Sequence, residues 1–238
     1  MRKAAFLATG LLLTASSLRA SPPNELTPSE KQAGWRLLFD GKTTTGWRGF
    51  NKTEFPSQRW VVREGTLTVL GAGTGDSHGG GDIVTTDKFS DFDLRWEWRV
   101  APGANSGLKY LVDEKRGEPI AHEYQILDDD KHPDAKVGPH RQSAAFYDVL
   151  PPAKDKRLKP VGEWNSSRVL VKGNHVEHWL NGRKVLEYEL GSPEIKAAIA
   201  KSKFKDVAGF DAKLSGPILL QDHGDEVAYR SIKILTKS

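Results

Sequence analysis

A strict alternation of apolar and charged side chains from residue 91 to residue 100 constrains the fold more than any other feature of the chain. Phenylalanine, leucine, tryptophan and valine occupy the even positions, and aspartate, arginine and glutamate occupy the odd ones. A period of two places the apolar side chains on one face of an extended strand and the charged ones on the other. We therefore expect residues 91–100 to form an antiparallel strand with one face in the core and one in water.

Similar runs continue along the chain, and turn signals separate them. The pair Asn181-Gly182 favours the two-residue turn of a hairpin. One segment is predicted as a helix, from a Ser192 cap through Pro193 to about residue 203. Further strands are predicted at 60–62, 66–69, 107–112, 122–127, 143–149, 168–172, 176–180, 184–189, 218–221 and 227–235.

About a dozen short strands, one short helix and no alternation of strands with helices predict an all-β fold. The expected architecture is a single two-sheet antiparallel sandwich over residues 34–238. The chain has 238 residues, and 37% of them are hydrophobic, which is enough for a core and excludes a disordered chain. The lack of cysteine excludes disulfides, thiolate zinc sites and a cysteine nucleophile.

Residues 1–20 have the pattern of a secretory signal peptide: a basic start, an apolar run too short to span a bilayer, and small residues. We expect the protein to be exported to the periplasm or the medium, without a membrane span. The polar, proline-containing residues 21–33 are predicted as a linker or mobile N-terminus. Removal of Arg2, Lys3 and Arg19 leaves 32 basic side chains against 31 acidic ones, so the formal charge does not favour a nucleic-acid partner.

Residues 71–82 are rich in glycine, but they lack the Gly-Lys-Ser/Thr sequence and the strand-to-helix junction of a phosphate-binding loop. We interpret them as a flexible loop beside a binding face. The chain also lacks the His-Glu-x-x-His sequence and the 12-residue calcium-binding loop, so it carries neither of these metal-binding motifs.

The predicted strand at 122–127 carries the most informative polar residues. Glu123 and Gln125 share one face, opposite the apolar face that is expected to enter the core. With Asp128 they form the spacing Glu-x-Gln-x-x-Asp, which looks like a degenerate form of the Glu-x-Asp-x-x-Glu strand of laminarinase-like glycosidases. Ordinary double displacement needs two carboxyl groups about 5–5.5 Å apart, so the amide at 125 argues against that mechanism. The alternative is an exposed polar strand face.

Three other segments also place polar side chains where a strand would face away from the core. Each alone is more often a solvated strand face, but four such strands together favour a sheet that binds sugars through polar groups and aromatic rings. For each aromatic ring, the alternative is packing in the core. The side chains concerned are Asn105, Lys109, His178, Gln221 and His223, with Tyr147 and Trp179 as candidate stacking groups.

Seven short motifs follow one another along the chain: Gly34-Trp35-x-Leu-Leu-Phe39-Asp40-Gly41, Asn105-Ser106-Gly107-x-Lys109-Tyr110, Glu123-Tyr124-Gln125-Ile126-Leu127-Asp128, Gly162-Glu163-Trp164-Asn165, Val176-Glu177-His178-Trp179-Leu180-Asn181-Gly182, Ser202-Lys203-Phe204 and Leu220-Gln221-Asp222-His223-Gly224. Together they resemble the 3-keto-disaccharide hydrolase domain family, over essentially all of residues 35–234. The resemblance implies a concanavalin-like or laminarinase-like jelly-roll sandwich. It also implies export from a bacterium and action on glycosides that are oxidised at C3 of the sugar.

A ketone at C3 makes the proton at C2 acidic, so the glycosidic oxygen at C1 can leave by elimination, and water addition then gives net hydrolysis. This route needs a base at C2, donors at the C3 oxygen and an acid at the departing oxygen. The predicted catalytic residues are Glu123, His178, His223 and Lys109. The predicted substrate-binding residues are Asn105, Gln125, Tyr147, Trp179 and Gln221.

Three alternatives stay open at this point. One is a structural or scaffolding sandwich, in which the Glu, Gln, His and Lys side chains would lie scattered in space. A divalent metal bound by Glu123, His178 and His223 would stabilise the enolate in place of the side-chain donors. A non-catalytic carbohydrate-binding module would keep the sugar platform, and it would tolerate loss of Glu123 better than loss of Trp179.

Overall fold

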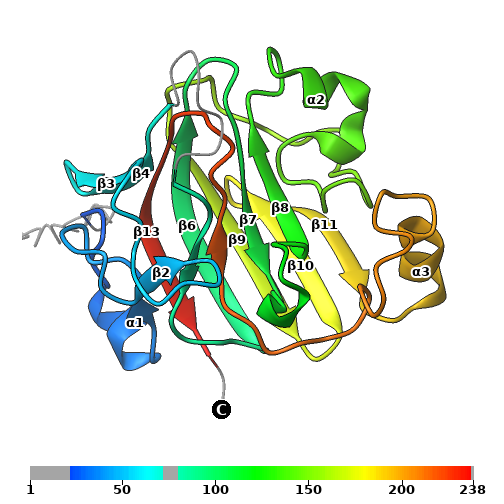
Figure 1. The fold of residues 1–238 in the computed structure, drawn as a ribbon, viewed down its shortest axis with the longest axis horizontal. Helices are drawn as coiled ribbons and strands as arrows, with labels where there is room; N and C mark the ends of the chain where they lie inside the picture. The colour runs from blue at the N-terminus through cyan, green and yellow to red at the C-terminus, as the bar shows by residue number, and fades with distance from the viewer. Residues whose placement is uncertain (1–21, 72–79, 237–238) are drawn as a thin grey trace, which may run out of the picture.

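Two antiparallel sheets face each other across one core in the computed structural model (Figure 1). It describes residues 22–71 and 80–236, so the predicted signal peptide and most of the glycine-rich loop lie outside the described residues. Export therefore stays a prediction. Among the residues that are described, no helix is long and apolar enough to cross a bilayer.

The larger sheet has eight strands: β1 (Arg36–Leu37), β3 (Trp60–Arg63), β4 (Thr66–Val69), β6 (Phe92–Val100), β9 (Asn165–Lys172), β10 (His175–Leu180), β11 (Arg183–Glu189) and β13 (Val227–Leu235). They are ordered β11-β10-β9-β6-β13-β4-β3, and β1 pairs with β13. The smaller sheet consists of β2 (Trp47–Gly49), β5 (Ile83–Thr85), β12 (Leu219–Leu220), β7 (Asn105–Tyr110) and β8 (His122–Leu127), in that order. The predicted two-sheet antiparallel sandwich is confirmed.

The alternating segment forms β6, which lies in the middle of the larger sheet between β9 and β13. Its even-numbered side chains are at most 6% exposed, whereas the odd-numbered ones are half-buried on the outer face. Because both neighbours of β6 are hydrogen-bonded strands, its apolar face covers the centre of the core.

In the smaller sheet, β7 and β8 pair in a register that sets Lys109 opposite Glu123 and Gly107 opposite Gln125. The alternate residues of both strands, such as Leu108, are buried in the main core. Successive side chains of a strand point to opposite faces. Lys109, Glu123 and Gln125 therefore point outward, away from the larger sheet.

The part of the chain that the structure describes has three short α-helices at the edges of the sandwich, whereas the sequence predicted one helix. The predicted helix is α3 (Pro193–Ile199), which begins after the Ser192 cap and ends earlier than expected. The other two are α1 (Pro28–Gln32) and α2 (Pro133–Val137), each with five residues. A helix of that length is too short to show an apolar period of 3.6 residues, which explains why sequence patterns did not reveal it.

The prediction of a linker or mobile N-terminus at 21–33 is wrong for the described part of that range. Asn24 Oδ1 accepts a hydrogen bond from the Ser231 amide at 2.8 Å, and Glu30 forms an ion pair with Lys233. Both partners belong to β13, so the N-terminal segment is attached to the larger sheet.

The segment predicted as a strand at 143–149 is irregular. Ala144 and Asp148 have φ angles of 70° and 61°, in the left-handed region that a strand does not use. The segment still follows β8, because the Tyr147 amide donates to the Glu123 carbonyl at 3.1 Å. This contact places Tyr147 beside the outward face of β8.

Candidate functional site

A pocket of about 360 Å³ lies on the outer face of the smaller sheet, and we call it the β7–β8 pocket. Its walls are the outward residues of β7 and β8, the segment before β8, the irregular segment after β8, residues that follow α3 and residues that follow β12. The structure brings together seven of the nine predicted site residues here: Asn105, Lys109, Glu123, Gln125, Tyr147, Gln221 and His223. Their catalytic and binding roles stay predictions.

Glu123 and Lys109 form an ion pair in the β7–β8 pocket. Lys109 Nζ lies 3.5 Å from Glu123 Oε2 and donates a hydrogen bond to the Pro119 carbonyl at 2.8 Å. Both side chains are less than a tenth exposed, at 8% for the lysine and 7% for the glutamate. The carboxylate lies across Gly107, where an added Cβ would be 2.5 Å from Glu123 Oε1. Glycine at 107 therefore provides the space for a buried carboxylate with an adjacent cation.

Two amide oxygens of the pocket are unsatisfied. Asn105 Oδ1 and Gln221 Oε1 are buried, and neither has a hydrogen-bond partner among the described residues. A buried acceptor without a partner costs about 1–3 kcal/mol, so such atoms are normally bonded by water or a ligand. Hydroxyl groups are suitable donors for them. A hydroxyl group of a ligand, or a water molecule, can donate to each of these two oxygens.

Tyr147 and Lys203 form another part of the pocket wall. Lys203 Nζ lies 4.2 Å from the centre of the Tyr147 ring, which is a cation–π distance. Burial lowers the pKa of Lys203, and the negative charge of Glu123 acts in the opposite direction. Lys203 is not among the predicted site residues, because it follows α3 in a segment without strand phase. Its signal was the motif Ser202-Lys203-Phe204.

A second cavity, of about 590 Å³, shares Pro119, Gln221 and His223 with the wall of the β7–β8 pocket. Phe50 and Asp82 also line it, and we call it the Phe50–Asp82 cavity. Burial raises the pKa of Asp82. Asp82 is not among the predicted site residues, because it ends the glycine-rich segment and lies outside any alternating pattern.

The prediction that His178 belongs to the site is wrong. His178 is fully buried between the two sheets, where Nδ1 donates to the Ala144 carbonyl at 3.0 Å and Nε2 lies 2.6 Å from the Tyr110 hydroxyl. Burial lowers the pKa of His178 to about 3. The physical reason is topological: β10 belongs to the larger sheet, so its inward side chains reach the core and not the outer face of the smaller sheet.

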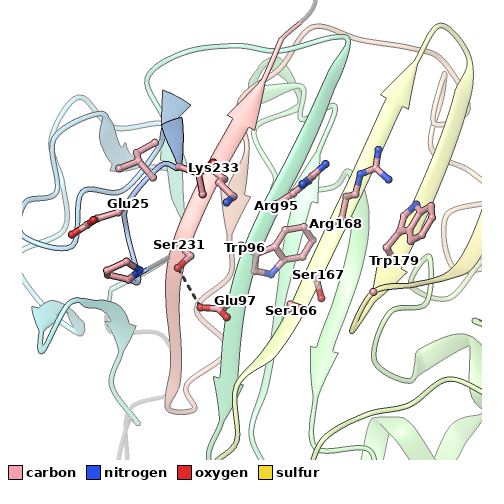
Figure 2. A pocket seen from close by; sticks show the side chains of 14 residues that line it. Glu25, Arg95, Trp96, Glu97, Ser166, Ser167, Arg168, Trp179, Ser231 and Lys233 are labelled. Carbon is pink, nitrogen blue, oxygen red and sulfur yellow. Dashed lines mark hydrogen bonds between the residues drawn. The ribbon is translucent and has the colours of Figure 1, made fainter. Parts of the chain in front are cut away.

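The prediction that Trp179 stacks in the same pocket is also wrong. Trp179 lines a different groove, of about 510 Å³, on the outer face of the larger sheet. Figure 2 shows Arg95, Arg168 and Trp179 on neighbouring strands of this groove. The Arg168 guanidinium lies 5.0 Å from the Trp179 ring centre, and both arginines are bound by Asp93. Because Arg95, Arg168, Asp93 and Trp179 already contact one another, the groove on the larger sheet is a weaker candidate for a site than the β7–β8 pocket.

The structure does not bring together the three residues considered as metal ligands. Glu123 and His223 line the β7–β8 pocket, whereas His178 lies in the core. The described ranges contain a group of three potential ligands elsewhere, at His175, Glu177 and Glu187 on β10 and β11. Lys184 pairs with both of these glutamates, so that group is already neutralised in part.

Comparison with known families and proteins gives consistent results. A family described as the 3-keto-alpha-glucoside-1,2-lyase-like domain matches residues 34–235. A protein of Bacteroides thetaiotaomicron named 3-keto-disaccharide hydrolase is 39% identical to the chain over 244 residues. The match covers 92% of this chain and 83% of that protein.

Two solved structures illustrate the fold similarity. A protein of Parabacteroides distasonis, for which a glycosyl hydrolase assignment has been suggested, has a TM-score of 0.80 and 34% identity, over 91% of this chain and 100% of its own. A β-glucanase of Bacillus licheniformis has a TM-score of 0.50 and 13% identity, over 86% and 97% of the two chains. The second similarity concerns the fold alone, and it agrees with the expected laminarinase-like sandwich.

Proposed function

The chain belongs to the family of 3-keto-alpha-glucoside-1,2-lyase-like domains, and we propose that it cleaves the glycosidic bond of 3-keto-disaccharides. The observation that carries this proposal is the buried pair of Glu123 and Lys109 in a pocket with two unsatisfied amide oxygens. A carboxylate beside a fixed cation suits the removal of a proton whose loss creates an oxyanion.

The proposed reaction begins at C2 of the keto sugar. Glu123 takes the C2 proton, and the electron pair of the C2–H bond forms an enolate with the C3 oxygen. The enolate then reforms the C3 ketone and expels the C1 oxygen, which leaves a double bond between C1 and C2. The departing oxygen takes up a proton. Water then adds its hydroxyl to C1 and a proton to C2, so the sum of the steps is hydrolysis.

The other residues of the pocket serve binding and charge stabilisation in this proposal. Lys109 and the Gln125 amide stabilise the negative C3 oxygen, a contribution of about 10²–10³ in rate for one well-placed donor. Asn105 and Gln221 accept hydrogen bonds from sugar hydroxyls through the two oxygens that lack partners. Tyr147 supports the sugar ring from the side. No step requires a metal ion at the positions of Glu123 and His223.

The experiment is incubation of the protein with 3-keto-trehalose in deuterated water. We expect release of the second sugar and deuterium at C2 of the 3-keto product, because the proton lost to Glu123 is returned from solvent. A sample without protein measures spontaneous exchange next to the ketone, and trehalose itself serves as the unoxidised control. Release of sugar with an unlabelled C2 would contradict elimination, and sugar binding without any cleavage would support a carbohydrate-binding module instead.

A further inference from the structure

A disaccharide needs space for two rings, and the β7–β8 pocket continues into a second space of suitable size. The Phe50–Asp82 cavity has about 590 Å³ and shares its wall with the β7–β8 pocket at Pro119, Gln221 and His223. A sugar held over Glu123 therefore has its second ring in the Phe50–Asp82 cavity when its C1 oxygen points toward Gln221 and His223. Phe50 is half-buried there and offers an aromatic ring to the second sugar.

Two carboxyl groups line the Phe50–Asp82 cavity, and they differ in what they bind. Asp222 is held by Arg59 through both oxygens, at 2.9 and 2.8 Å, and its side chain is fully buried. Asp82 accepts one hydrogen bond at Oδ1 from the Asp222 amide, at 2.9 Å. Asp222 is therefore a structural anchor that orients Asp82. Within the described residues, Asp82 is the carboxyl group of this cavity that has no arginine partner.

The surroundings of Asp82 raise its pKa above the ordinary value. Burial is the largest cause and the nearby charge of Glu123 adds to it, whereas Lys109, the hydrogen bond from the Asp222 amide and His223 act in the opposite direction. Elimination needs a proton at the departing oxygen, and Glu123 is occupied with the C2 proton at that moment. A second carboxyl group with a raised pKa is the type of acid that this step uses.

We infer that the Phe50–Asp82 cavity holds the departing sugar and that Asp82 donates the proton to its oxygen. The step is balanced: the C1–O bond breaks toward oxygen, the Asp82 proton moves to that oxygen, and the carboxylate regains a proton from solvent. The inference rests on the proposed function, because it assumes the same elimination over Glu123.

The test compares Asp82→Asn with wild type on two substrates: 3-keto-trehalose and the 4-nitrophenyl 3-keto-α-glucoside. Nitrophenolate leaves as a stable anion and needs no acid, whereas a sugar oxygen does. We expect Asp82→Asn to lower kcat/KM for the disaccharide by at least about 10²-fold and for the nitrophenyl glycoside by less than about 3-fold. Asparagine keeps the oxygen that binds the Asp222 amide, and thermal unfolding checks that the fold is retained.

Two further variants complete the test. Phe50→Ala is expected to raise KM for the disaccharide by about 2- to 10-fold, with little change for the nitrophenyl substrate. Asp87→Asn removes an exposed carboxylate that pairs with Arg36 outside both cavities, and it should match wild type on both substrates. Equal losses on the two substrates, or full disaccharide activity of Asp82→Asn, would overturn the role of Asp82. Absence of wild-type turnover on both substrates would overturn the proposed function itself.

Discussion

The inner and outer faces of β7 and β8 both carry buried polar side chains, but these side chains differ in their hydrogen bonding. On the inner face, Tyr110 and His122 bind His178 and Tyr188 of the larger sheet through hydrogen bonds of 2.6–2.9 Å. On the outer face, neither Asn105 Oδ1 nor Oε1 of Gln221, which follows β12 beside β7, has a partner in the described part of the chain. The difference teaches that burial alone does not identify a site, because the buried polar groups of the inner face bind one another, whereas the outer face keeps acceptors free to bind a ligand.

The largest effect is expected on the outer face. Glu123→Gln removes the proposed base while it keeps the size of the side chain and most of its hydrogen bonding. The rate on 3-keto-trehalose should fall by at least about 10²-fold, because a positioned acid–base group contributes about 10²–10⁴. Steady-state kinetics measures this change, with Glu187→Gln on the exposed part of β11 as the matched control. Full activity of Glu123→Gln would contradict the role of Glu123 as the base.

The inner face should respond in stability rather than in rate. His178→Phe leaves the Ala144 carbonyl without its donor and deprives the Tyr110 hydroxyl of a buried partner. We expect the free energy of unfolding to fall by about 1–3 kcal/mol, since unsatisfied buried groups cost that much. Denaturant unfolding measures the loss, and kcat of the folded variant should stay within about two-fold of wild type. A large fall in kcat at unchanged stability would contradict the assignment of His178 to the core.

Acid should weaken the inner face through its two histidines. Burial lowers the pKa of His122 to about 4 and that of His178 to about 3, both below the usual value of 6.5. The unfolded chain therefore binds protons on these residues first, and the free energy of unfolding falls as the pH drops below 6.5. The slope is at most about 1.4 kcal/mol per pH unit for each histidine. Unfolding curves between pH 7 and 5 measure it, and a slope that is no smaller in His178→Phe would contradict this origin.

The smallest effect is expected for Trp179→Ala. Trp179 lies on the outer face of the larger sheet, and its indole nitrogen donates to Glu177 at 2.7 Å. We expect kcat/KM for 3-keto-trehalose to stay within about two-fold of wild type, because this ring lines a different groove from Glu123. A loss of sugar affinity, measured by calorimetry, would show that the groove on the larger sheet also takes part in binding.

Much of the fold follows from local patterns in the sequence. The alternation in β6 predicts a strand with one buried face, and the phase of β7 and β8 predicts which side chains share a face. The same phase groups Lys109, Glu123 and Gln125, which the structure brings together in one pocket. These predictions need only the period of two within each strand.

Other features depend on relations that a local pattern does not contain. The phase of β10 places His178 and Trp179 on opposite faces of the strand, but it does not show to which sheet β10 belongs. Because β10 belongs to the larger sheet, neither side chain reaches the β7–β8 pocket. Asp82 reaches the site from a loop, and its position depends on a contact with Asp222, far away in the sequence. The left-handed backbone at Ala144 has no signal in an apolar run that otherwise reads as a strand.

The polar side chains on the inner face of β7 and β8 form a chain of contacts that has fewer hydrogen atoms than contacts. Five contacts of hydrogen-bond length join the Phe210 carbonyl, His122, Tyr188, Tyr110, His178 and the Ala144 carbonyl in one line. Both ends are carbonyl oxygens, which only accept, so each imidazole must direct its N–H outward. With neutral histidines, the two rings and two phenols supply one hydrogen each, which is one fewer than the line requires. One of the five contacts therefore lacks a hydrogen atom at any moment. Rotation of the two hydroxyl groups decides whether this is the His122–Tyr188, the Tyr188–Tyr110 or the Tyr110–His178 contact, inside an otherwise fixed core.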